Sequence, residues 1–120
     1  MEINIGMDGD VVIMSITGDL VASSAEEFKS QVAKLADKKF HFILVEMSKV
    51  NFMDSSGLWA CMAVHKMLSG KTGKMVLARP SEPVGKVLRL TRADQKLNIA
   101  STPRDGINVL HDAIIAGRKK

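Results

Sequence analysis

The sequence contains one cysteine, three prolines and only five aromatic residues, none of them tyrosine. A single cysteine excludes an internal disulfide, so Cys61 is expected to be a small core residue rather than half of a cross-link. No apolar run approaches the ~20 residues that a membrane-spanning helix needs. The first residues also lack the basic and apolar segments of a signal peptide. We therefore expect a cytoplasmic protein without membrane insertion.

The chain has 120 residues, of which 46% are hydrophobic, and this suits one domain over residues 1–120 with a single core. Its net charge of +4 is unevenly placed, because residues 61–120 hold 12 basic against 4 acidic side chains. The basic positions 86, 89, 92 and 96 recur at the spacing of one helix face. This pattern fits a solvated face first and an acidic protein partner second. Direct nucleic-acid binding is disfavoured because aromatics for base stacking are few.

Strand candidates alternate with helix candidates along the chain, which predicts an α/β fold with a mainly parallel sheet. We expect four to five strands and about four helices. The first two strands should lie at a sheet edge, and a capping box of Ser24 and Glu27 should begin the first helix. The expected strands cover residues 3–5, 11–16, 41–47, 75–78 and 97–100, and the other helices begin near residues 57, 80–83 and 103.

The segment from Val50 to Leu58 carries the main functional signal, because a polar loop and two serines directly follow the apolar strand candidate 42–45. A breaker-free run from Gly57 onward predicts a helix. Its first turn has backbone N–H groups without internal partners, and Asp or Ser side chains commonly cap such groups. One cap requires one residue, either Asp54 or Ser55, so a second hydroxyl is left over. That hydroxyl is a candidate phosphorylation site.

The run Phe52-Met53-Asp54-Ser55-Ser56-Gly57-Leu58 resembles the signature of the STAS domain family, specifically its stand-alone bacterial anti-sigma factor antagonists. The segment from Val11 to Leu20 is similar to the family's second strand and following turn, and the order of elements agrees nearly to the end of the chain. The resemblance implies a STAS-like fold. It also implies that Ser55 is phosphorylated, with Asp54, Ser56 and Gly57 as its environment; the small Gly57 would leave the approach open.

The same resemblance implies a non-enzymatic regulator of transcription in a partner-switching pathway. The unphosphorylated form would bind an anti-sigma factor with serine kinase activity and so release a sigma factor, and a serine phosphatase would restore that form. No cofactor and no metal are expected. The implied partner-binding residues are Asp19, Met53, Asp54, Ser55, Ser56, Leu58 and Trp59. An alternative of another class is a ligand-binding or scaffold module of a transport or sensory complex, in which Ser55 only caps a helix.

Trp59 stands where this family usually has a small residue. The helix predicted here has an inward stripe through residues 58, 61, 62, 65 and 68, so Trp59 should be exposed and anchor the partner. A hydrolase is disfavoured, because Asp54-Ser55-Ser56-Gly57 is not a G-x-S-x-G elbow. A phosphate-binding loop at 70–72 lacks the glycine it needs, since that position is His65. The three histidines and one cysteine show no metal-ligand spacing.

Overall fold

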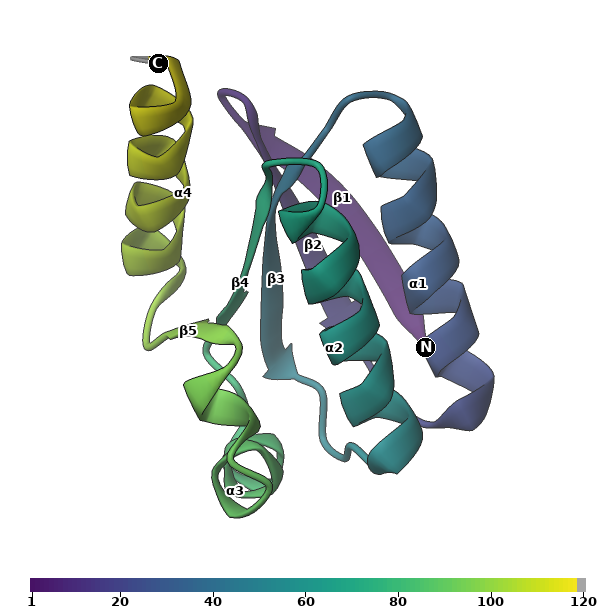
Figure 1. Ribbon diagram of the computed structural model, residues 1–120. Helices are drawn as coiled ribbons and strands as arrows, with labels where there is room; N and C mark the ends of the chain where they lie inside the picture. The colour runs from purple at the N-terminus through teal and green to yellow at the C-terminus, as the bar shows by residue number, and fades with distance from the viewer. Residues whose placement is uncertain (119–120) are drawn as a thin grey trace.

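The computed structural model describes residues 1–118 and contains a five-stranded sheet in the order β1-β2-β3-β4-β5 (Figure 1). β1 and β2 form an antiparallel hairpin, whereas every other neighbouring pair is parallel. This confirms the predicted α/β fold, with the apolar run 42–45 in the central strand. The strands are β1 (Glu2–Asp8), β2 (Val11–Thr17), β3 (Phe42–Lys49), β4 (Lys74–Ala78) and β5 (Asn98–Ala100).

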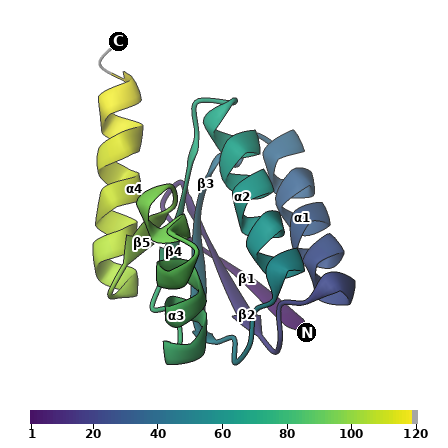
Figure 2. The same ribbon diagram turned by 60° about the horizontal axis from the view of Figure 1, so that its bottom comes forward.

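Helices cover both faces of the sheet, as parallel strands joined by helical crossovers require. α1 and α2 run side by side on one face and α4 lies on the other (Figures 1 and 2). A short 3-10 helix, η1, connects α3 to β5. The helices are α1 (Ala22–Asp37), α2 (Ser55–Ser69), α3 (Glu82–Leu90), η1 (Ala93–Gln95) and α4 (Pro103–Arg118).

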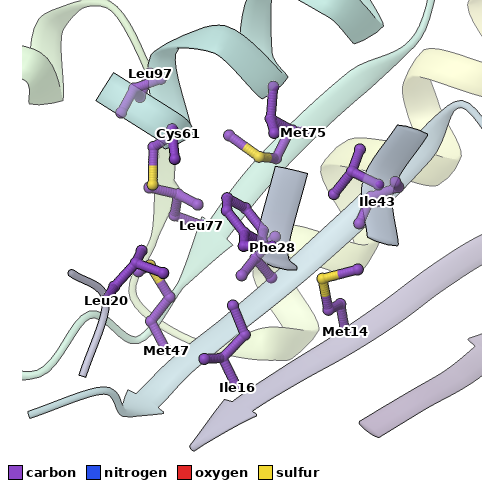
Figure 3. Packing of buried hydrophobic residues seen from close by; sticks show 14 of the residues in the cluster. Met14, Ile16, Leu20, Phe28, Ile43, Met47, Cys61, Met75, Leu77 and Leu97 are labelled. Atoms are coloured by element: carbon purple, nitrogen blue, oxygen red, sulfur yellow. The ribbon is translucent and has the colours of Figure 1, made fainter. Parts of the chain in front are cut away.

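The core has two parts because successive strand residues point to opposite faces. The larger part lies between the sheet and α1 and α2, where Phe28 of α1 packs among strand side chains (Figure 3). Cys61 of α2 is in this part, and burial raises the pKa of its thiol to about 12. The prediction that Cys61 is a core residue is thus confirmed. The smaller part lies under α4 and centres on Leu44, Val76 and Leu110.

Three predictions about elements need correction. α1 begins at Ala22 rather than Ser24, and Ser24 itself accepts from the Val21 N–H group at 2.9 Å, the role expected of Glu27. β2 is not an edge strand, because it pairs with both β1 and β3. The buried stripe of α2 is rotated from the predicted one. It consists of residues 57, 60, 61, 64 and 68, while 58, 62 and 65 are half-buried.

Candidate functional site

The candidate site is built from loops that leave the same end of the parallel strands. The Leu20 N–H group donates to the Phe52 carbonyl at 2.9 Å, which ties the first loop to the second. The Ser81 hydroxyl donates to the Val50 carbonyl at 2.5 Å, which ties in the third. The carboxyl ends of parallel strands are where α/β proteins usually place their sites. The three loops cover residues 18–21 after β2, 50–54 after β3 and 79–81 after β4.

Asp54 is the N-cap of α2. Its Oδ1 atom accepts from the Ser56 N–H group at 2.9 Å and from the Gly57 N–H group at 3.2 Å. An acidic N-cap is further favoured by the positive end of the helix dipole. The structure therefore assigns the cap to Asp54, a choice that the sequence left open between Asp54 and Ser55.

Ser55 is the first residue of α2 and is exposed. Within residues 1–118 its hydroxyl makes no hydrogen bond, so no structural role accounts for it. The carboxylate of Asp54 already occupies two first-turn N–H groups. A phosphate on Ser55 would therefore not find those two donors free. Such a phosphate would lie at the surface beside a carboxylate.

Gly57 and Met53 are buried, which corrects their predicted roles. A Cβ atom at Gly57 would lie 2.3 Å from the Leu20 carbonyl oxygen, so glycine is required for α2 to approach this loop and does not open a path to Ser55. Met53 is only 2% exposed and forms a parallel bridge with Leu20. The Met53 side chain therefore lies in the core and not on a partner surface.

The other predicted partner-binding residues reach the surface to different degrees. Trp59 is 70% exposed, which confirms the predicted exposure of its side chain, and Asp19 is exposed on the neighbouring loop. Ser56 and Leu58 are half-buried. The sequence reasoning missed Phe52, which is 51% exposed in the same loop. The exposure of Phe52 could have been predicted, because successive side chains of an extended segment point to opposite sides and Met53 points inward.

A charged cluster fixes the end of β3 from which the site loop departs. The Glu46 carboxylate accepts from the Ser48 N–H group and from the Arg79 guanidinium, each at 2.7 Å. Burial works against the ionised form of Glu46, but the hydrogen bonds from Ser48 and Arg79 outweigh it and lower its pKa. The cluster therefore links the ends of β3 and β4 with an ionised carboxylate at neutral pH.

No triad forms around Ser55 in the described part of the chain, and His65 lies ten residues after Ser55 on α2, roughly 15 Å along the helix. His41 contacts the Ala36 carbonyl at 3.1 Å, and His111 contacts the Asp8 carboxylate at 3.1 Å. Both histidines lie at the end of the sheet where β3 begins, whereas Ser55 follows the end where β3 finishes. Residues 1–118 contain no group of three His, Cys, Asp or Glu side chains placed to hold a metal ion. None of the described helices is long and apolar enough to span a membrane.

The five-stranded sheet with this strand order is the fold shared with STAS-type structures. The family model for the STAS domain matches residues 2–106, so the chain belongs to the STAS domain family.

Its relatives within that family are named for anti-sigma factor antagonism. A candidate anti-sigma factor antagonist of Thermotoga maritima is 32% identical over 94 residues, which span 78% of this chain and 83% of the relative. A crystal structure of a T. maritima candidate antagonist gives a TM-score of 0.85 at 27% identity, covering 91% of this chain and 94% of that one. The anti-sigma factor antagonist SpoIIAA, in its unphosphorylated form, shares the fold at 18% identity with a TM-score of 0.70, covering 92% of this chain and 98% of its own.

Proposed function

We propose that this chain is an anti-sigma factor antagonist whose binding is switched by phosphorylation of Ser55. The observation that carries the proposal is the division of roles at the start of α2, where Asp54 caps the helix and the exposed Ser55 hydroxyl has no hydrogen-bond partner within residues 1–118. Membership of the STAS family and the names of the relatives support this reading. SpoIIAA, which shares the fold, is also known in a phosphorylated form.

The switch would work through charge. Phosphorylation adds about 1.5 to 2 negative charges and three acceptor oxygens. Since Asp54 already holds the first-turn N–H groups, the helix start offers the phosphate little compensation. A like-charge pair at ~4 Å and an effective dielectric constant near 20 costs up to ~4 kcal/mol, while a micromolar complex is worth ~8 kcal/mol. One phosphate next to an acidic or apolar partner surface is therefore enough to decide binding.

The proposed partners follow from the same mechanism. The unphosphorylated chain, as one STAS domain in the cytoplasm, binds an anti-sigma factor that also acts as its serine kinase, and a sigma factor is released. A serine phosphatase restores the binding form. The chain itself performs no catalysis and contacts no nucleic acid directly. Its contact surface comprises the exposed or half-buried residues Asp19, Asp54, Ser55, Ser56, Leu58 and Trp59.

The test uses each kinase-like anti-sigma factor encoded in the source genome, purified and incubated with this chain and ATP. Mass spectrometry should place the phosphate on Ser55. Ser55→Ala should retain partner binding and escape phosphorylation, whereas Ser55→Asp should weaken binding, because a carboxylate reproduces part of the added charge. Ser23→Ala, at an exposed serine near the start of α1, is the matched control and should behave as wild type.

Phosphate found only on Ser56, Ser23 or Ser24 would refute the assignment of Ser55. Equal binding by Ser55→Asp and wild type would show that charge is not the switch. If no such anti-sigma factor binds or modifies the chain, the alternative of a ligand-binding or scaffold module in a transport or sensory complex is favoured, with Ser55 as an ordinary surface residue.

A further inference from the structure

The surface beside Ser55 continues from α2 onto α3 and η1. Trp59 and the half-buried Leu58 and Met62 of α2 line a cavity of about 130 Å³ together with Thr91, Ala93 and Lys96. Leu97, which follows η1, and Cys61 of α2 are both buried in the larger core cluster (Figure 3). The surface of α2 and that of η1 thus form one continuous region.

This region combines exposed apolar side chains with exposed cations. Leu90, which directly precedes Thr91, is 74% exposed, and Trp59 is 70% exposed. Lys86 lies one helical turn before Leu90 on α3 and is exposed, as are Arg92 and Lys96. Within residues 1–118, none of these three cations forms a salt bridge. We call Trp59, Lys86, Leu90, Arg92 and Lys96 the basic–apolar surface.

We propose that the basic–apolar surface binds an acidic segment of a protein partner that presents one apolar side chain to the cavity beside Trp59. Charge complementarity argues for carboxylates, because residues 82–96 hold four basic against two acidic side chains and none of the three cations forms a salt bridge within residues 1–118. The cavity of about 130 Å³ is too small for a cofactor-sized ligand, whose sites occupy roughly 300–1,000 Å³.

A nucleic acid fits this surface less well than an acidic protein does. Trp59 is the only aromatic side chain of the basic–apolar surface, so bases would find one stacking platform rather than several. The Asp54 carboxylate, one helical turn before Leu58, would also repel a phosphate backbone that followed α2. For a protein partner, in contrast, a large rigid side chain such as Trp59 is a typical interface anchor.

The inference rests on the proposed function for the identity of the natural partner, but its test does not need that partner. The full chain is titrated with a short synthetic peptide of glutamates around one central leucine, and emission from Trp59 is recorded. We expect saturable binding with a blue shift. Lys86→Glu combined with Lys96→Glu should weaken binding about tenfold or more, because two attractive charge pairs become repulsive.

Lys34→Glu combined with Lys38→Glu is the matched control, since it makes the same charge change at exposed positions on the last turn of α1 and its C-cap. It should bind the peptide as wild type does, and thermal melting should show both double variants folded. Absence of peptide binding, equal weakening in both double variants, or tighter binding of an oligothymidylate of equal charge would each overturn the proposal.

A second arm separates this inference from the proposed function. The two double variants are compared in binding the anti-sigma factor identified above. If that factor binds wild type and both variants equally, the proposed function stands and the inference fails. If the acidic peptide binds with the expected charge dependence but no anti-sigma factor binds, the surface stands and the proposed function fails.

Discussion

Three adjacent polar residues at the start of α2 have different surroundings. Asp54 accepts from two N–H groups, Ser55 points its hydroxyl to solvent, and Ser56 lies half-buried in the groove between α1 and α2. A carboxylate caps the helix better than a hydroxyl would at the positive end of the dipole. The use of Asp54 as the cap therefore leaves Ser55 available for modification at little cost to the helix.

Gly57 is the residue whose replacement should disturb the site most directly. In Gly57→Ala the new methyl group would lie 2.3 Å from the Leu20 carbonyl oxygen and 3.0 Å from the Met53 side chain, so α2 must move away from the loop. We expect a loss of unfolding free energy of about 1–3 kcal/mol, typical of overpacking, measured by urea denaturation.

Gly117→Ala, where an added Cβ has no neighbour within 4 Å among residues 1–118, is the control and should be neutral or slightly stabilising. Unchanged stability of Gly57→Ala would contradict the close packing of α2 against the loop after β2.

At the scale of elements, α2 is held by burial on one side while its other side carries the candidate site. Ala60, Cys61 and Val64 pack into the core, whereas Ser55 and Trp59 are exposed. The helix therefore presents the candidate side chains on a rigid support, since the opposite side of the same turns is packed in the core.

The thiol of Cys61 should report whether α2 stays docked. Burial excludes reagents and raises the pKa of the thiol to about 12, so at pH 8 it remains protonated and unreactive. Ellman's reagent should label it only through opening of the structure, at a rate that rises with urea. As pH rises above about 9, the unfolded thiol ionises and the native thiol does not, so native stability should fall.

A Ser55→Cys variant in a Cys61→Ala background provides the matched control for this labelling. Its thiol would sit at the exposed start of α2 and should react rapidly without denaturant. Rapid labelling of Cys61 in the wild type would show that α2 opens readily, which the packing in Figure 3 argues against.

At the scale of the whole molecule, the sheet brings the three loops after β2, β3 and β4, and the starts of α1, α2 and α3, to one end of the molecule. β3 pairs in parallel with both β2 and β4, so the loops that follow these three strands leave the sheet at the same end. The Leu20–Phe52 and Val50–Ser81 hydrogen bonds link the loops to one another. α4 and the β1–β2 turn meet at the opposite end, where His111 contacts Asp8. Phosphorylation at Ser55 is thus expected to change the local surface while the sheet stays as it is.

Trp59 allows this expectation to be measured, because it is the only tryptophan. In the free chain its emission should be that of a water-exposed indole. Binding of the anti-sigma factor should shift the emission to the blue, and the Ser55-phosphorylated chain should show no such shift when mixed with the same factor. Blue-shifted emission in the free chain that does not change on binding would place the interface elsewhere.

Periodicity and turn chemistry were sufficient to predict the order of elements and the class of fold. All four residues of the run 42–45 are apolar, a pattern typical of a strand that is buried on both faces. The run lies in β3, which is the central strand of the sheet. The exposure of Trp59 also followed from helical spacing. These features depend on residues close together in the chain, so the sequence contains the information directly.

Contacts between distant segments were decided only by the tertiary structure. Met53 was expected to bind the partner, but its side chain is buried where the loop pairs with Leu20, and a Cβ atom at Gly57 would collide with the Leu20 carbonyl. α1 begins at Ala22, two residues before the predicted Ser24. The Ser24 hydroxyl instead donates to the Asp19 carbonyl at 2.7 Å and so ties the first turn of α1 to the preceding loop. The sequence by itself determined which main elements form and where the candidate hydroxyl of Ser55 falls. Only long-range packing decided which of its neighbours face solvent, because burial depends on what the rest of the chain places against them.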